Sequence, residues 1–233
     1  MALPVINAPT YELVLPSTKE KITYRPFLVK EEKILLIAME DGEEATIVRA
    51  VRQIVNNCTF EKLDPDIMAT FDLEYVFLNI RAKSVGEVAT LNLLSPDDDK
   101  TYVKVEIPLD KVKVKFTKGH SNNIKLTDDI SVEMRYPTFE MLQESTNNTT
   151  ENVFSIVAEC VERIFDGEDI YERVDFTKDE LDAFLDSLGT KQFQEVQNFF
   201  ETMPKLSHDV TFINPETKKE NTITLEGMQS FFV

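Results

Sequence analysis

Hydrophobic and polar residues alternate near the start of the chain, in the stretch YELVLPSTKEKITYRPF at residues 11–27. Alternation with a period of two residues is typical of a β-strand that has one buried face. It runs on both sides of a Pro-Ser pair, which favours a turn. The pattern therefore predicts an N-terminal β-hairpin.

The spacing of apolar residues becomes helical in KEEKILLIAMEDGEEATIVRAVRQIVNNC, residues 30–58. Apolar residues recur there every three or four positions, and the polar stretch EDGEE interrupts them, so two helices are predicted. The segment LDPDIMATFDLEYVFLNIRAKSVGE, residues 63–87, continues the helical spacing. Asp64 before Pro65 is a start signal for this third helix, and Gly86 is a stop signal.

Strand-like alternation returns at Glu87 and continues to Tyr136. Polar turns such as SPDDDK and TKGHSNN separate the alternating stretches. Together they predict a central antiparallel sheet of about four or five strands. The stretches are EVATLNLL, TYVKVEI, KVKVKF, NIKL and ISVEMRY.

A polar segment, ESTNNTTE at residues 144–151, has the least pattern of any part of the chain. We interpret it as the main linker, which divides the chain into an N-terminal α+β domain at 1–144 and a C-terminal domain at 151–233. The predicted fold class is α+β. It comprises an N-terminal β-hairpin and helices, the central antiparallel sheet, and a C-terminal helical part ending in a β-hairpin.

Three helices are predicted in the C-terminal part. The first is NVFSIVAECVERIF, residues 152–165, where apolar residues form one stripe. Thr177 and Glu180 form a capping box at the start of the second, and Gly189 is its predicted end. The third is TKQFQEVQNFFETMP, residues 190–204, which stops before its final proline.

The chain closes with VTFINPETKKENTITLEGMQSFFV, residues 210–233, which reads as a hairpin followed by aromatic residues. Its turn, NPET, has the length and shape of a zinc knuckle. Asn214 and Thr217 occupy the two ligand positions, and an amide oxygen and a hydroxyl are poor zinc ligands. We therefore expect a hairpin without metal.

The chain is strongly acidic, with 42 acidic and 25 basic residues and a net charge of -17. This balance argues against nucleic acid as a partner, because lysine and arginine must replace the counterions of the phosphates. The longest apolar run, ILLIAM, is shorter than the roughly 18–20 residues of a membrane span. The start of the chain lacks the features of a signal peptide. Cys58 and Cys160 lie in no motif and are predicted to be buried thiols.

No catalytic motif is recognisable in the sequence. His120 and His208 are interpreted as surface residues near turns. The acidic stretches SPDDDK and FDGEDIYE lack the spacing of a calcium loop and are interpreted as solvated turns. We predict a protein that is not an enzyme and has no metal, cofactor or small-molecule substrate. A hydrolase with an unrecognised pair of carboxylates stays open as an alternative.

Three stretches of the chain resemble a known family. They are YRPFLVKEEKILLIAMEDGEEATIVRAVRQIVNNC at 24–58, FDLEYVFLNIRAKSVGE at 71–87, and MPKLSHDVTFINPETKKENTITLEGMQSFF at 203–232. In these motifs the chain resembles the T4-type bacteriophage baseplate hub proteins of contractile-tailed phages. Relatives commonly carry a CPxC knuckle between the last two strands. Here the knuckle reads Asn214-Pro215-Glu216-Thr217, so the proline is kept and both cysteines are replaced.

The resemblance implies a non-enzymatic baseplate hub component or hub-assembly protein that acts through protein–protein contacts. Its partners would be other phage tail and baseplate proteins. It would lie in the host cytoplasm during assembly and in the virion baseplate if it is retained. Two interpretations stay open: a resident subunit of the hub, or an assembly chaperone that is absent from the mature virion.

Two sets of residues are candidates for function. One set follows the closing hairpin on a predicted helical turn, and would either bind a partner or cover the chain's own core. Its members are Met228, Phe231 and Phe232. The other set contains the polar residues of the second family motif, which would form a structural ion pair or cap, or an interface. Its members are Glu74, Arg81 and Glu87.

Overall fold

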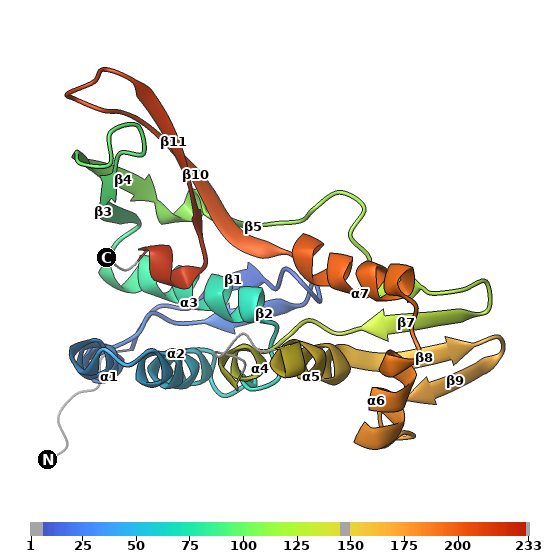
Figure 1. The fold of residues 1–233 in the computed structure, drawn as a ribbon. Coiled ribbons are helices and arrows are strands. Elements are labelled where there is room, and N and C mark those ends of the chain that lie inside the picture. Colours follow the sequence, from blue (N-terminus) through green and yellow to red (C-terminus); the bar gives the residue numbers. More distant parts are fainter. Residues whose placement is uncertain (1–6, 145–149, 232–233) are drawn as a thin grey trace, which may run out of the picture. The chain divides into compact units, whose positions relative to one another are not determined.

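The computed structural model describes residues 7–144 and 150–231, which form an α+β fold with antiparallel sheets (Figure 1). Contacts divide the chain into two compact units, one at 1–115 with 205–233 and the other at 116–204. These units differ from the predicted ranges because the last strands of the chain return to pair in the first unit. The predicted division into folding domains at 144–151 stays a prediction.

The predicted N-terminal hairpin is confirmed. Strands β1 (Tyr11–Val14) and β2 (Lys21–Tyr24) pair antiparallel. The turn between them is attached to a helix, because the backbone N–H of Ser17 donates to Asp72 at 3.1 Å and the Ser17 hydroxyl donates to the other carboxylate oxygen. Burial outweighs these hydrogen bonds and raises the pKa of Asp72.

Three helices follow the hairpin, namely α1 (Val29–Asp41), α2 (Glu44–Cys58) and α3 (Thr70–Val85). The predicted break between the first two is confirmed. Gly42 has φ of 73°, which glycine adopts without strain, and its N–H bonds the carbonyl of Ala38. Helix α3 begins six residues later than Asp64, because residues around Pro65 form turns, in which Asp64 accepts the N–H of Asp66.

Two sheets complete the first unit. One is the hairpin of β3 (Val88–Leu94) and β4 (Tyr102–Pro108); the other has the order β11 (Glu220–Glu226), β10 (Lys205–Ile213), β5 (Lys113–Lys115). A short 3-10 turn, η1 (Leu109–Lys111), joins β4 to β5. The alternating pattern therefore predicts β3, β4 and β5 correctly. They do not form the single central sheet that the sequence predicted, because β3 and β4 pair with each other and β5 pairs with β10. Buried residues from α3, from these strands and from the segment after β11 form one core, which includes Leu78, Leu91, Ile107, Leu206, Leu225 and Phe231.

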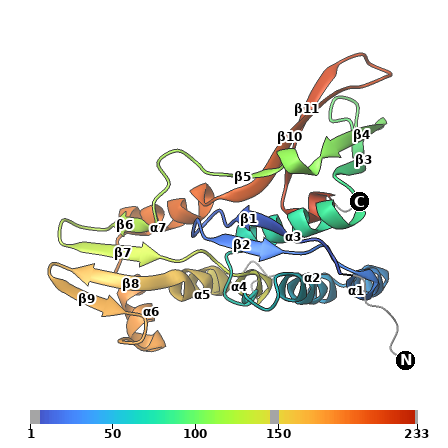
Figure 2. The ribbon, with the colours of Figure 1, turned by 180° about the vertical axis from the view of Figure 1, so that it is seen from behind.

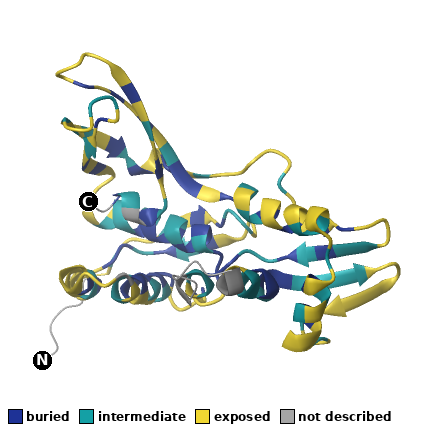
Figure 3. Cartoon of the chain, in the orientation of Figure 1, coloured by how far each residue is buried: buried dark blue, intermediate teal, exposed yellow. Residues whose placement is uncertain are grey.

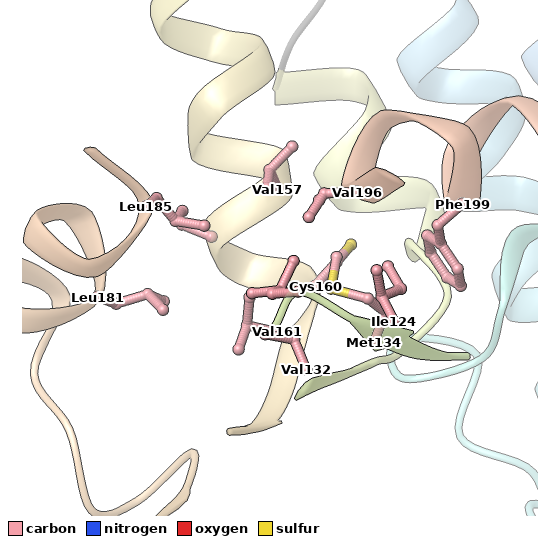
Figure 4. Packing of buried hydrophobic residues seen from close by; sticks show 12 residues of the cluster. Ile124, Val132, Met134, Val157, Cys160, Val161, Leu181, Leu185, Val196 and Phe199 are labelled. Carbon is pink, nitrogen blue, oxygen red and sulfur yellow. The ribbon is translucent and has the colours of Figure 1, made fainter. Parts of the chain in front are cut away.

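The second unit contains a sheet with the order β6 (Asn123–Lys125), β7 (Ile130–Met134), β8 (Val161–Asp166), β9 (Asp169–Glu172). Its helices are α4 (Phe139–Glu144), α5 (Thr150–Cys160), α6 (Lys178–Asp186) and α7 (Thr190–Thr202). Figure 2 shows these four strands side by side, with helices α6 and α7 next to them. Figure 4 shows side chains of α5, α6 and α7 converging on this sheet.

The prediction of one helix over residues 152–165 is wrong beyond Cys160, where the chain becomes strand β8. Two arginines satisfy carbonyls at the end of α5: Arg135 Nε donates to Glu159 at 2.9 Å, and Arg173 Nη1 donates to Ala158 at 3.1 Å. The residues that follow then pair with β7, as in Val132 opposite Ile164. Pairing with a distant strand overrides the local helical spacing.

The predicted capping box of α6 is confirmed, since the Thr177 hydroxyl and the Glu180 carboxylate each bond the other residue's backbone N–H. Gly189 does not end this helix. Helix α6 ends at Asp186, and Gly189 is the N-cap residue of α7, which confirms the third predicted helix.

Both cysteines are free and buried, as predicted. Burial raises the pKa of the Cys58 thiol to about 11 and that of Cys160 to about 12. Within the residues that the structure describes, none of the helices is long and apolar enough to cross a membrane.

Candidate functional site

The turn of the closing hairpin is held by the carboxylate of Asp97. Asn214 is fully buried; its side-chain amide donates to Asp97 Oδ1 at 2.9 Å, and its Oδ1 accepts the N–H of Glu216 at 2.9 Å. Asn221 donates to the same Asp97 oxygen at 3.0 Å, and the Thr217 hydroxyl donates to Asp97 Oδ2. These hydrogen bonds, that of Thr217 first, lower the pKa of Asp97.

The two knuckle positions thus act as hydrogen-bond donors to a carboxylate from the turn between β3 and β4. In residues 7–144 and 150–231, His, Cys, Asp and Glu form no group of three or more that could hold a metal ion. Sequence reasoning interpreted SPDDDK as a solvated turn and so missed the role of Asp97. The only available signal was the loss of both knuckle cysteines, which does not identify a partner so distant in the chain.

Glu74 of α3 contacts the segment after the closing hairpin. Its Oε1 accepts the backbone N–H of Met228 at 3.1 Å. Gly227 precedes this bond with φ of 71°, and a Cβ there would lie 3.2 Å from the same oxygen. Burial outweighs the hydrogen bond and raises the pKa of Glu74 to about 7. The contact links the second and third family motifs.

Met228 and Phe231 lie on the short 3-10 turn η2 (Met228–Phe231), and both are buried, with exposures of 1% and 0%. Phe231 packs in the core of the first unit. Their side chains therefore pack within the chain itself in this structure. The third residue of the set, Phe232, lies outside the described residues.

The described contacts of Glu74 do not include the other two polar residues of the second motif. Glu87 is exposed and pairs with Lys83. Arg81 lies partly buried on α3, and burial lowers its pKa. The structure thus gives Glu74 a bond to Met228 and Glu87 an ion pair with Lys83, both within the first unit.

A buried ion pair fixes the start of α1. Glu31 is fully buried, and Arg25 Nη2 lies 3.0 Å from its Oε1. The backbone N–H of Leu28 donates to Glu31 Oε2 at 2.9 Å. Burial acts to raise the pKa of Glu31, but the hydrogen bonds from Arg25 and Leu28 outweigh it and lower the pKa. Sequence reasoning did not single out this pair.

The sequence suggested that His120 lies on the surface, but the structure shows that its side chain is partly buried. One ring nitrogen lies 3.0 Å from the Thr202 hydroxyl and the other 3.1 Å from the Tyr136 hydroxyl. The ring also packs against Phe199, and burial lowers its pKa. These contacts give His120 a packing role between helix α7 and Tyr136, which lies just after β7.

Helix α1 exposes apolar residues over the side opposite Glu31 and Ala38. We call this surface the α1 face, which consists of Val29, Leu36, Ile37 and Met39. Val29 is 66% exposed and Ile37 is 64% exposed, and Figure 3 shows most of the helix as exposed or intermediate. Exposed apolar side chains that gather on one helix mark a surface that another protein can cover. The α1 face is therefore the candidate interaction surface of the first unit.

A family model described as T4 bacteriophage base plate protein matches residues 8–233, nearly the whole chain. The chain belongs to this family. Searches of curated proteins and of solved structures gave no match. The baseplate family implies other phage tail and baseplate proteins as partners, and the baseplate of the virion tail as the location. The contacts of Glu31 with Arg25 and of Glu74 with Met228 lie within the matched range.

Proposed function

We propose that this baseplate protein is a non-enzymatic component of the baseplate hub, and that it works by protein–protein contacts. The α1 face carries the proposal, because it combines exposed apolar side chains with a helix start that the buried Arg25–Glu31 pair holds in place. A rigidly held apolar surface loses little conformational entropy when a partner covers it.

Other features of the described residues support a protein-binding function over an enzymatic one. The buried carboxylates have structural partners: Glu31 with Arg25 and Asp72 with Ser17. The net charge of -17 supports protein partners over nucleic acid. We propose that the protein acts in the host cytoplasm during assembly and stays in the baseplate afterwards.

Quantitative mass spectrometry of purified virions and of tail-assembly intermediates tests this function. We expect the protein in both fractions in a fixed ratio to other baseplate proteins, and no baseplates after deletion of its gene. Presence in intermediates only, with assembly blocked by the deletion, would instead identify an assembly chaperone. Normal baseplates without the protein would contradict both roles.

A further inference from the structure

The second unit contains a groove of about 360 Å³ between the sheet and helix α6. Aliphatic and aromatic side chains line it, among them Ile164, Phe176 and Phe184. Three carboxylates also line it: Asp166, Asp175 and Glu180. The groove therefore combines an apolar lining with concentrated negative charge.

The strand register explains why no cation neutralises this charge from the sheet. Ile164 lies opposite Tyr171, and Ile130 opposite Asp166, and all four face the groove. Arg163 precedes Ile164 on β8, so its side chain lies on the opposite face of the sheet. There it pairs with Glu133 at 2.9 Å and with Glu172 at 3.6 Å. No lysine or arginine is among the described residues that line the groove.

Hydrogen bonds hold two of the carboxylates in place. Asp175 Oδ2 accepts the backbone N–H of Glu172 at 2.8 Å. Glu180 Oε2 accepts the backbone N–H and the hydroxyl of Thr177, each at 2.8 Å, and these bonds lower the pKa of Glu180. In the described contacts, each of these carboxylates uses one oxygen, so the other can accept a bond from a ligand.

Strand β9, beside the groove, is an edge strand of its sheet. All four of its residues are exposed, including Ile170 and Tyr171, and Val174 just after it is 88% exposed. An edge strand offers backbone N–H and C=O groups to which an extended segment of another protein can pair. Exposed apolar side chains beside such an edge add contact area for that segment.

We propose that the groove and the β9 edge dock an extended segment of a partner baseplate protein, one in which lysine or arginine stands beside aliphatic residues. The apolar stem of such a side chain matches the lining, and its charged end matches the three carboxylates. The volume is near the lower end of the roughly 300–1,000 Å³ of ligand pockets, which suits one or two side chains better than a helix. A second copy of this chain would bring its own charge of -17 to an acidic site.

This inference rests on the proposed baseplate function, which supplies the set of partners to test. The probe is an array of overlapping 12-residue peptides that covers the other baseplate proteins of the same phage. The purified full-length chain is applied to it, and affinities for bound peptides are then measured in solution. We expect the bound peptides to carry lysine or arginine next to aliphatic residues, and to bind more weakly as salt rises.

The double variant Asp166→Asn/Asp175→Asn removes two charges from the groove while keeping the shapes of both side chains. The matched control is Glu168→Gln/Asp186→Asn, which removes two charges at exposed positions that do not line the groove. We expect the groove variant to bind the peptides about ten-fold more weakly, and the control to bind as the unaltered chain does. Circular dichroism checks that both variants fold.

Equal loss in both double variants would show a diffuse charge effect and overturn the proposal. So would an array with no bound peptide, or peptides bound without a basic residue. Spermidine that displaces the peptides at matching concentration, and binds with the same dependence on Asp166 and Asp175, would assign the groove to small cations instead. Virion analysis could find none of this protein in the baseplate while the groove still binds basic peptides selectively. That result would contradict the proposed function but support the proposed binding of basic segments in the groove.

Discussion

The side-chain amide of Asn214 donates to the carboxylate of Asp97 at 2.9 Å, across 117 residues of sequence. The bond joins the turn of the β10–β11 hairpin to the turn between β3 and β4. It explains how a knuckle-shaped turn persists without cysteines. A buried amide with partners for both its oxygen and its nitrogen stabilises the turn from within.

Replacing the side-chain amide of Asn214 should destabilise the folded protein. Asn214→Ala leaves Asp97 and the backbone N–H of Glu216 without their partner, so we expect the free energy of unfolding to fall by about 1–3 kcal/mol. Urea denaturation measures this change. Glu216→Ala, at an exposed position of the same turn, is the control and should stay close to the unaltered protein. Equal stability of both variants would show that the Asn214 bonds contribute little.

Chelators should not affect stability. The described contacts hold the turn by hydrogen bonds to Asp97, so we expect the melting temperature to be the same with and without EDTA. Metal analysis of the purified protein completes the test. One zinc ion per chain, or a lower melting temperature in EDTA, would contradict the interpretation of the knuckle as metal-free.

Glu74 should make stability depend on pH. Its pKa is raised from 4.5 to about 7 in the folded state, so the folded state binds the proton more tightly than the unfolded state does. Stability from this group is therefore full below pH 4.5 and is lost as pH rises towards 7, by on the order of 3 kcal/mol at most. Glu74→Gln keeps an acceptor for the Met228 N–H and should remove this part of the pH dependence.

The measurement is the free energy of unfolding of both proteins between pH 4.5 and 8. The Glu74→Gln variant should gain in stability relative to the unaltered protein as pH rises from 4.5 to about 7, and the difference should stay constant from there to pH 8. Glu87→Gln, which alters an exposed carboxylate of the same motif, is the control. Parallel curves for the Glu74 variant and the unaltered protein would rule out titration of Glu74 in this range.

Breaking the buried ion pair should destabilise the protein more than any of these changes. Glu31→Ala leaves the Arg25 guanidinium, which is 13% exposed, without its carboxylate and removes the acceptor for the Leu28 N–H. We expect a loss of about 3–5 kcal/mol in the free energy of unfolding. The control is Glu32→Ala at the neighbouring exposed position. A loss below 1 kcal/mol would mean that water replaces the carboxylate.

The α1 face should matter for assembly and not for folding. Leu36→Ser/Ile37→Ser removes two exposed apolar side chains, so we expect unchanged thermal stability and reduced incorporation into tail-assembly intermediates. The matched control is Ile67→Ser/Val85→Ser, which alters two other exposed apolar residues of the first unit. Quantitative mass spectrometry of the intermediates gives the readout. Normal incorporation of the α1 variant would contradict the proposal that the α1 face binds a partner during assembly.

Local patterns predicted the elements whose stabilising contacts are close in sequence. The alternation around Pro16 led to the first hairpin, and the Thr177–Glu180 pair led to the start of α6. The start of α3 and the end of α5 were misplaced, because contacts of Asp64 in one case and pairing of β8 with β7 in the other outweigh helical spacing.

Sequence alone determined the α+β class, most element positions and, through three motifs, the baseplate family. Only the tertiary structure decided that β10 pairs with β5, that Asp97 binds the closing turn, and that Glu74 binds the Met228 N–H. Periodicity reports which face of an element is buried, because that depends on near neighbours. It does not report which distant segment covers that face, because the choice depends on packing and hydrogen bonding of the whole chain.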